Sequence, residues 1–267
     1  MSGSNAFLAL WNGLDRSDAR EEYEAWHAME HVPERVGLPG FLWGHRYVRG
    51  SDTGGSDAGG APSAAGSSYF TVYGLQGLDA LQTAQYADVI AHPTPWSARM
   101  RPRLSAFVRR PCALVATAGA STAAHLVAVR ATTADLPGWS AAATQALAGA
   151  EDSALLVRAS AGAVPPALDL AYPVGGERIA QAVTGQTTVV LLAEHCTAEG
   201  ARQGAQWLLE RLAPWSLPGV QAESFVLQSQ VVRSDLPADV SQRPHSRLPP
   251  RLGPMNRYFF TLKPDCR

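Results

Sequence analysis

The sequence predicts an α+β fold built from two tandem βαββαβ units that pair with each other within one chain. Three observations lead to this prediction: a repeat at constant spacing, alternating apolar segments typical of strands, and helical segments at matching places in both halves. At 267 residues the chain is long enough for two ordinary domains.

Four segments of the first half recur in the second half at one offset of 119 residues. The matched pairs are AFLALW (6–11) with HLVAVR (125–130), YFTVY (69–73) with TVVLL from Thr188, PTPWS (93–97) with LAPWS (212–216), and SAFVRR (105–110) with SFVLQS (224–229). Trp96 and Trp215 coincide, which favours a packing role, because a site residue need not be kept twice. We infer a duplicated domain.

The elements of the first unit follow from local sequence. β-branched and aromatic residues predict the first strand, and Ser17 or Asp18 is expected to cap a helix that Pro33 and the turn GLPG (37–40) end. The expected order is strand 6–12, helix 17–32, strand 41–48, strand 69–75, helix 77–91 and strand 102–109. The second unit is expected as strand 125–131, helix 138–149, strand 154–160, strand 187–194, helix 198–212 and strand 220–231.

This order is that of the ferredoxin-like, split βαβ unit, whose bare sheet face usually packs on a second sheet. We therefore expect an internal pseudo-dimer, with a homodimer of such chains as a further possibility. The predicted domains are 1–115, 120–233 and a C-terminal arm 234–267 that packs through Tyr258, Phe259 and Phe260. The Gly/Ser/Ala-rich connection 50–68 is expected to be flexible or disordered, and 161–186 is a second long connection.

Composition excludes several classes of function. Lys and Arg number 22 against 23 Asp and Glu, so the charge balance indicates neither nucleic acid nor an anionic membrane as partner. The sequence shows no signal peptide, no apolar run of membrane-spanning length and no CxxC motif among its three cysteines, which predicts a cytoplasmic protein. Dinucleotide- and ATP-binding motifs are absent from the sequence as well.

A family resemblance adds to this interpretation. EEYEAWHAMEHVPERVGLPGFLWGHRYV (21–48) resembles the first helix and second strand of dimeric α/β-barrel proteins of the EthD-like kind. The matching residues are Trp26, Glu30, His31, Pro33, Pro39, Gly40, Phe41, Arg46 and Tyr47, and HPTPWSARM (92–100) looks like the segment before the family's last strand. The resemblance covers residues 5–110 well and 120–232 in outline. It implies the fold, and its relatives include cofactor-free oxygenases, lactone isomerases, polyketide cyclases and haem-dependent enzymes.

His27, Glu30 and His31 spell H-x-x-E-H, the pattern of a class of zinc proteases. We predict no metal and no cofactor for three reasons. The helix is expected to end within two residues of His31, spacing marks no third ligand, and the resemblance accounts for Glu30 and His31 without zinc.

Helical periodicity places Ala19, Tyr23, Trp26, Met29 and Pro33 in an apolar stripe that should face the sheet. Glu30 falls inside this stripe, and a carboxylate there must be paired, protonated or next to a wet cavity. One interpretation is a catalytic site between helix and sheet. The other is that Glu30 pairs with Arg46 or caps a backbone group.

The strand 41–48 alternates between two faces, one with Phe41, Trp43, His45 and Tyr47 and the other with Leu42, Gly44, Arg46 and Val48. The aromatic face lines either a ligand cavity or the contact between the sheets. We expect the substrate to be contacted by Trp26, Trp43, Tyr47, Tyr73 and Arg46. At the repeat offset, His27, Glu30 and His31 correspond to Ala146, Gly149 and Ala150, so the site is expected in the first half alone.

The leading hypothesis is a small-molecule enzyme with His31 and Glu30 as proton-transfer groups and His27 or His45 assisting. Isomerisation, cyclisation or cofactor-free oxidation of a modest apolar or aromatic carbonyl compound would all begin with proton abstraction beside the carbonyl. The alternative is a non-catalytic small-ligand-binding or assembly protein. A third hypothesis is a metal- or haem-dependent oxidoreductase.

Overall fold

The structure, a computed structural model, describes residues 3–15, 17–50, 68–165 and 185–237. Nearly all of the connection 50–68, most of 161–186 and the C-terminal arm from residue 238 lie outside the described residues. The expectations of flexibility and of an extended arm therefore stay predictions.

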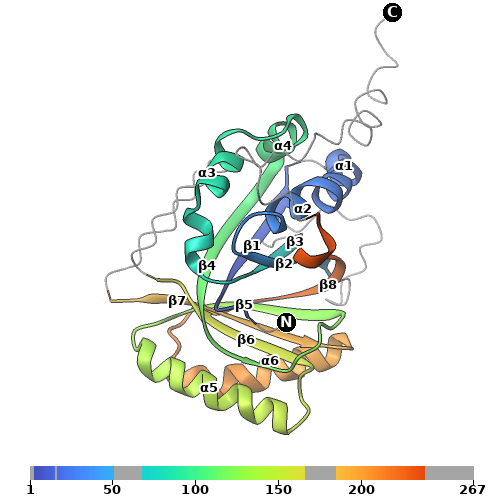
Figure 1. Ribbon diagram of the computed structural model, residues 1–267. Helices are drawn as coiled ribbons and strands as arrows, with labels where there is room; N and C mark the ends of the chain where they lie inside the picture. The colour runs from blue at the N-terminus through green and yellow to red at the C-terminus, as the bar shows by residue number, and fades with distance from the viewer. Residues whose placement is uncertain (1–2, 16, 51–67, 166–184, 238–267) are drawn as a thin grey trace, which may run out of the picture.

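Eight strands form one closed antiparallel barrel in the order β1-β3-β2-β8-β5-β7-β6-β4 (Figure 1). Their bounds are β1 Ala6–Leu14, β2 Phe41–Arg49, β3 Tyr69–Leu75, β4 Leu104–Ala118, β5 His125–Thr133, β6 Arg158–Ala163, β7 Thr187–His195 and β8 Gln221–Val232. Each half contributes four strands in the same order, β4-β1-β3-β2 and β8-β5-β7-β6. The pairs β2–β8 and β4–β6 join the halves, which confirms the α+β fold with two sheets paired inside one chain.

The repeat offset of 119 residues carries both ends of β1 onto both ends of β5. The strand β4 is much longer than the expected 102–109, since it continues to Ala118 to pair with β6 of the other half. Local sequence could not show this extension, because the residues of the partner strand lie about forty to fifty positions further along the chain.

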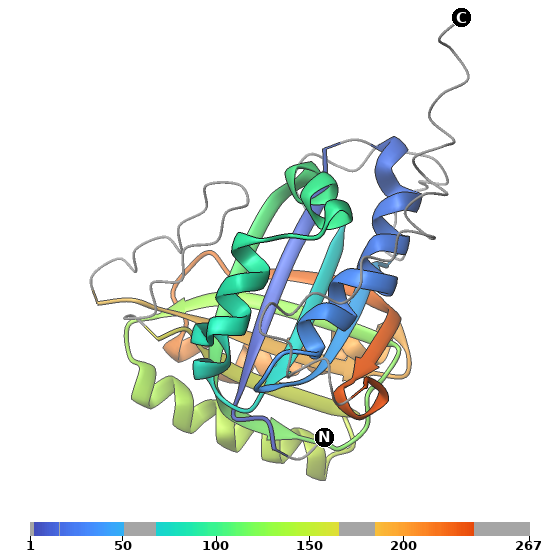
Figure 2. The same cartoon turned by 45° about the horizontal axis from the view of Figure 1, so that its top comes forward.

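The helices lie outside the barrel in two layers (Figure 2). The first half carries α1 Arg20–Trp26, a π-helix His27–His31, α2 Val32–Val36, α3 Ala84–Ala91 and α4 Pro95–Met100. The second half carries α5 Leu136–Asp152 and α6 Ala198–Leu212. Short 3₁₀ turns occupy Ser17–Ala19, Leu78–Gln82, Arg101–Arg103, Ala213–Trp215 and Arg233–Asp235.

The first helix differs from its prediction. It begins with a 3₁₀ turn, so that Ala19 and not Ser17 or Asp18 stands at the N-cap position of α1, and it runs on through the π-helix and α2 to Val36. Pro33 does not end it, because the proline occupies the first turn of α2, where a missing N–H costs little. The i→i+5 bonding of the π-helix changes the helical phase, and Met29, expected in the buried stripe, is 47% exposed.

The apolar core has an interior part and two outer parts. Inside the barrel, aromatic residues of the first half such as Trp11, Tyr47 and Phe70 pack with Leu192 and Phe225 of the second half. A β-bulge after Phe41 turns this ring to the helix side, where it packs with Tyr73 and Tyr86, so the predicted grouping of Phe41 with Trp43 is wrong.

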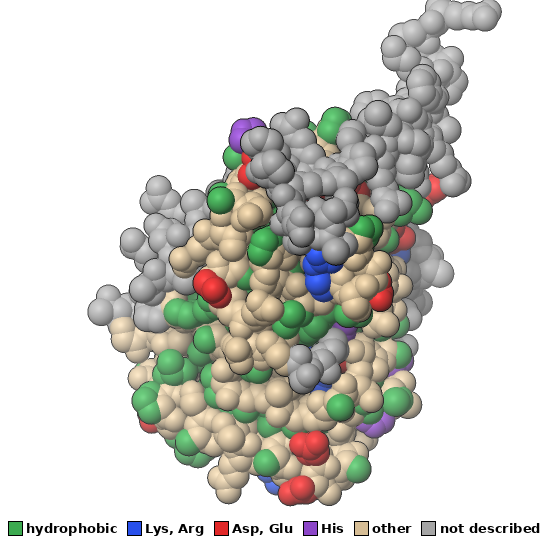
Figure 3. Space-filling model, viewed as in Figure 1, with side chains coloured by type: hydrophobic (Ala, Val, Ile, Leu, Met, Phe, Trp, Pro, Cys, Tyr) green, Lys and Arg blue, Asp and Glu red, His purple; other side chains and the backbone are tan. Residues whose placement is uncertain are grey.

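The described part of the chain contains no helix long and apolar enough to span a membrane. On the face drawn in Figure 3, the described acidic and basic side chains are scattered among hydrophobic ones rather than gathered into a patch of one sign. This distribution agrees with the formal net charge of −1.

Candidate functional site

The H-x-x-E-H residues lie on the π-helix, and all three are buried, with exposed fractions of 5% for His27, 2% for Glu30 and 8% for His31. A single π-turn inside an α-helix is rare and occurs frequently at functional sites, because it turns side chains out of the ordinary helical phase. Here that turn brings both imidazoles to the inner side of the helix, and their ring centroids are 4.9 Å apart.

Glu30 is held by the start of α4. Its Oε1 accepts hydrogen bonds from the hydroxyl of Thr94 and, at 3.2 Å, from the hydroxyl of Ser97. Thr94 Oγ1 also caps α4 by accepting from the Ser97 N–H at 3.0 Å, and Trp26 Nε1 donates to Ser97 Oγ at 3.1 Å. The partners of Glu30 are therefore hydroxyls and not Arg46, and the carboxylate joins the π-helix to α4.

His27 and His31 line a cavity of about 20 Å³ between the first helix and the sheet of the first half. The Nδ1 atoms of both imidazoles are buried and have no hydrogen-bond partner among the described residues, and the same holds for the hydroxyl of Thr71 in the cavity wall. Leaving one such atom unsatisfied costs about 1–3 kcal/mol, so three in one cavity indicate that a ligand or ordered water completes them. Glu30 does not line this cavity.

Burial lowers the pKa of His27 and of His31 well below the ordinary value. The charges of Arg46 and Arg35 lower the pKa of His27 further, and those of Arg35 and Arg101 act on His31 together with the neighbouring His27. Both imidazoles are therefore neutral near pH 7, each with one donor and one acceptor nitrogen.

Arg46 supplies a buried positive charge beside His27. Its guanidinium lies between the rings of Tyr23 and Tyr69, at 5.2 and 5.1 Å from their centroids, and its Nη1 donates to Gln228 of the second half. Two further arginines, Arg35 and Arg109, stand in the cavity wall, and Arg35 is ion-paired with the buried Glu34, Nη1 to Oε2 at 2.9 Å. The positive charge that this pair does not neutralise favours negative charge on anything bound there.

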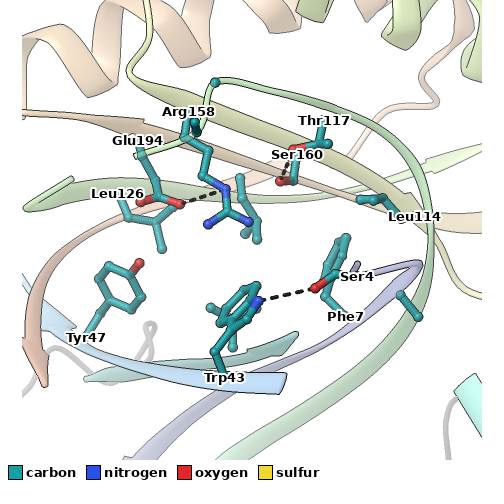
Figure 4. A pocket seen from close by; sticks show the side chains of 15 residues that line it. Ser4, Phe7, Trp43, Tyr47, Leu114, Thr117, Leu126, Arg158, Ser160 and Glu194 are labelled. Atoms are coloured by element: carbon teal, nitrogen blue, oxygen red, sulfur yellow. Dashed lines mark hydrogen bonds and ion pairs between the residues drawn. The ribbon is translucent and has the colours of Figure 1, made fainter. Parts of the chain in front are cut away.

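Trp43, His45 and Tyr47 face the barrel interior, on the opposite side of β2 from the histidine pair. This face lies at the contact between the sheets, and Trp43 and Tyr47 also line a cavity of about 70 Å³ there (Figure 4), so features of both interpretations are present. His45 Nδ1 lies 3.4 Å from the hydroxyl of Tyr47, and burial together with the charge of Arg158 lowers the pKa of His45 to about 4.

The nine predicted site residues thus divide into two groups. The helix-side group consists of Trp26, His27, Glu30, His31, Arg46 and Tyr73, and the interior group consists of Trp43, His45 and Tyr47. The structure adds Arg35 and Arg109 to the histidine cavity, and it adds Arg158 and Glu194 beside Trp43. Arg158 and Glu194 could have been found from the sequence, because each is a single charged residue within an otherwise apolar strand.

In the part of the chain that the structure describes, no group of three or more His, Cys, Asp or Glu side chains gathers to hold a metal ion. His27 and His31 are the side chains there that could offer two nitrogen ligands from one helix face. A haem group does not fit the histidine cavity as it stands, because about 20 Å³ has no room for a porphyrin.

No family model matches the sequence, and no curated protein matches it. Solved structures do match. A protein described as a putative monooxygenase from Lactobacillus acidophilus NCFM is 10% identical, with a TM-score of 0.53 over 86% of this chain and 97% of that one. An anthrone oxidase-like protein is 7% identical, with a TM-score of 0.57 over 87% of this chain and 94% of that one.

Identities this low show a shared fold and leave activity and the EthD-like assignment as predictions. The shared fold extends along almost the whole of both solved chains, and it agrees with the closed eight-stranded barrel formed by two four-stranded halves. The chain therefore has the fold of a dimeric α/β barrel, with two ferredoxin-like halves paired within one chain.

Proposed function

We propose that the chain is a small-molecule enzyme that moves a proton beside a carbonyl group, with His27 and His31 as its acid–base groups. The observation that carries the proposal is the helix-side cavity, where two imidazole nitrogens and the Thr71 hydroxyl are buried without partners. A protein that needed these histidines only for packing would gain stability by satisfying or replacing them.

The electrostatics suit formation of an enolate. Removing a proton beside a carbonyl leaves negative charge on the carbonyl oxygen, and Arg109 in the cavity wall stabilises that charge, with a smaller share from Arg35 because it is paired with Glu34. The proton passes to Nδ1 of one imidazole. Although nearby cations lower the histidine pKa in the free protein, the anion formed in the reaction offsets them, so the histidine becomes a better base as the reaction proceeds.

The cavity volume limits what enters it. About 20 Å³ accommodates roughly one or two water-sized groups, so the unliganded site takes the carbonyl end of a substrate and not a whole aromatic compound. Isomerisation, cyclisation and cofactor-free oxidation all share the first proton transfer. Oxidation would then need O₂ as co-reactant. The printed descriptions of the two solved neighbours, "putative monooxygenase" and "anthrone oxidase-like protein", are compatible with this group of reactions.

Glu30 has a positioning role in this proposal. By binding the hydroxyls of Thr94 and Ser97, it fixes the π-turn that presents both histidines. The prediction that Glu30 itself transfers a proton has no cavity to support it, since the carboxylate stays outside the lining.

The test measures the first proton transfer, which isomerisation, cyclisation and cofactor-free oxidation share. The protein is incubated in D₂O with a panel of small β-diketones and α-aryl ketones, and deuterium entering the α-carbon is followed by NMR while an oxygen electrode records O₂ uptake. We expect faster exchange with wild type, a loss of roughly 100-fold or more in His27→Gln or His31→Gln, and no change in Met29→Ala, whose side chain is exposed on the same turn.

Two outcomes would favour the other hypotheses. If the ketones bind, the histidine variants weaken that binding, and no exchange or O₂ uptake occurs, the chain is a binding protein. Stoichiometric metal by elemental analysis, or a haem absorption band in the purified protein, would replace the proposal with the oxidoreductase alternative.

A further inference from the structure

Tyr86 lines the histidine cavity but is not among the residues that the proposed proton transfer uses. It stands in α3, is 3% exposed, and stacks on Phe41 with the two ring centroids 5.8 Å apart. His27 and His31 line the same cavity from the π-helix. A space of about 20 Å³ holds roughly one or two water-sized groups, so the side chains that line it can contact one small occupant together.

The hydroxyl of Tyr86 accepts a hydrogen bond from Nη2 of Arg109 at 3.1 Å, and Arg109 lines the cavity as well. A phenol oxygen that accepts from a guanidinium still carries its own proton, which it can donate. In the part of the chain that the structure describes, this proton has no acceptor. The Tyr86 hydroxyl is therefore a buried donor for a group that enters the cavity.

Arg109 makes this hydroxyl a strong donor. Hydrogen bonds in a chain polarise one another, so an O–H whose oxygen accepts from a cation donates more strongly. The guanidinium carbon of Arg109 also lies 6.0 Å from the centroid of the Tyr86 ring, which keeps the positive charge beside the phenol. The other unpaired hydroxyl of the wall, that of Thr71, has no such partner among the described residues and is an aliphatic alcohol.

The second half of the chain carries neither member of this pair. At the repeat offset of 119 residues, Tyr86 corresponds to Ala205 and Arg109 to Gln228. Ala205 is buried in the apolar core of the second half, so packing of a helix on the sheet does not require a tyrosine at this place. The tyrosine and its arginine thus occur in the half that has the two histidines.

We infer that Tyr86 is a catalytic residue of the proposed enzyme, whose O–H binds the carbonyl oxygen of the substrate while an imidazole of the same cavity takes the α-proton. The inference rests on the proposed function. It also defines the substrate class further, because the substrate must present a carbonyl oxygen that can accept a hydrogen bond at the cavity.

The electron balance of the step is that of enolate formation. The α C–H bond breaks, its electron pair forms the C=C bond, and the π electrons of the carbonyl group move to oxygen. The proton goes to Nδ1 of His27 or His31, and the imidazolium later returns it to the α-carbon. Tyr86 keeps its own proton, and its hydrogen bond strengthens in the transition state because the accepting oxygen gains negative charge.

The test combines a binding signal with a rate. Phenylacetone labelled with ¹³C at its carbonyl carbon is bound to the full chain in D₂O, where its C=O infrared band and the deuterium exchange at its α-carbon are both measured. In wild type we expect the band of the bound ketone to lie lower than in an apolar solvent, because a hydrogen bond weakens the C=O bond. Tyr86→Phe should return the band to the apolar position and lower kcat of exchange by roughly 100-fold, with a much smaller change in KM.

Tyr69→Phe is the matched control. Tyr69 is a buried tyrosine of the same half whose hydroxyl already donates to Glu24 at 3.2 Å, and it does not line the cavity, so band and rate should match wild type. If Tyr86→Phe does not fold, 3-fluorotyrosine in place of Tyr86 decides. The fluorine keeps the ring and the hydroxyl and makes the phenol a stronger donor, so the band must move lower still.

The inference is overturned by the absence of a bound band, by a band that is unshifted in wild type, or by a shift that persists in Tyr86→Phe. A shift that Thr71→Val removes in its place would overturn it as well. Unchanged exchange in Tyr86→Phe would reject the catalytic role of Tyr86 and leave proton transfer by the histidines standing. A Tyr86-dependent shift with no exchange in any of the proteins would reject the proposed function and support Tyr86 as the group that binds the carbonyl oxygen.

Discussion

At the scale of single residues, this protein is distinguished by histidines buried in their neutral form. His27 and His31 sit in the helix-side cavity, and His45 lies in the barrel interior. Burial is the largest cause of the lowered pKa for all three. A neutral imidazole costs much less to bury than an imidazolium, so the fold depends on these groups staying unprotonated.

This dependence predicts acid sensitivity. The pKa of His45 falls from an unfolded value near 6.5 to about 4, so its contribution to stability is complete above about pH 6.5 and is lost as the pH falls toward about 4. The lowered pKa values of His27 and His31 likewise make the free energy of unfolding decrease as the pH falls. Within that window each histidine lowers the free energy of unfolding by up to about 1.4 kcal/mol per pH unit.

Urea unfolding of wild type and His45→Gln at about pH 7.5 and about pH 5 measures the effect. Wild type should lose more stability on acidification than the variant does. The difference between the two proteins is the quantity to compare, because the raised pKa values of Glu34 and Glu194 change stability in the opposite direction. The surface histidine variant His92→Gln is the control and should follow wild type.

Glu30 gives a second prediction at this scale. Glu30→Gln places a buried NH₂ or a weaker acceptor beside two hydroxyl donors, and we expect a loss of about 1–3 kcal/mol in the free energy of unfolding. In a double-mutant cycle with Thr94→Val, the two losses should be strongly non-additive. Additive losses would show that the two side chains do not act together, and Glu210→Gln on the exposed face of α6 should be neutral.

At the scale of elements, the π-helix is the feature that builds the candidate site. It joins α1 to α2, and within it both histidines face the cavity while Met29 is exposed to solvent. The irregular turn is fixed by the contacts of Glu30 with the start of α4. His27 and His31, four residues apart, would share one face in an ordinary α-helix too, so the π-turn changes the direction in which that face points rather than the pairing of the imidazoles.

Deleting Met29 tests this account. Removal of one residue allows the five-residue π-helix to close as an α-turn, which rotates His27 relative to His31. We expect deuterium exchange to fall to the level of the histidine variants while circular dichroism still reports a folded α+β protein. Met29→Ala keeps the chain length and should retain activity and stability within about 0.5 kcal/mol.

Packing of β2 on β3 predicts the effect of a small substitution. A Cβ on Gly74 would lie 2.1 Å from the indole of Trp43, so Gly74→Ala must displace that ring, at a cost of about 1–3 kcal/mol. Tryptophan fluorescence and thermal unfolding both report the change. Gly50→Ala is the control, since its Cβ would meet its nearest atom at an ordinary 3.6 Å. An unperturbed Trp43 signal in Gly74→Ala would contradict the packing described.

At the scale of the whole molecule, closure of the barrel joins the two halves. Antiparallel pairing of β2 with β8 and of β4 with β6 leaves no free sheet edge, and the interior core draws aromatic residues from both halves. An ion pair crosses the β2–β8 junction as well, where Glu223 binds Arg49 of the first half. Neither half covers its inner sheet face alone.

Residues 1–119 expressed alone should therefore dimerise or aggregate, because the inner face and the edges of β2 and β4 become exposed. Coexpression with 120–267 should give a one-to-one complex. Size-exclusion chromatography with light scattering distinguishes the outcomes, and a stable monomer of 1–119 would contradict this view of the barrel.

The strands, their order and the pairing of two repeats followed from the sequence, because hydrophobic alternation and a constant repeat offset are local signals that need no tertiary contact. The sequence likewise pointed to residues 27–31 as unusual, since two histidines and a carboxylate in an apolar helix must be explained by burial or by function. The sequence could not show how the predicted site residues divide between the helix side of the sheet and the barrel interior.

Tertiary structure alone decided three matters. The π-turn and the bulge after Phe41 each change which side of the element the following side chains face. The π-turn depends on contacts with α4 and the bulge on contacts of Phe41 with Tyr73 and Tyr86, rather than on neighbours in the chain. The contact between the sheets placed Trp43 and Tyr47 away from the histidines and beside Arg158 and Glu194, more than a hundred residues further along the chain. Side chains from such distant strands meet only when the barrel closes, so no local pattern could have joined them.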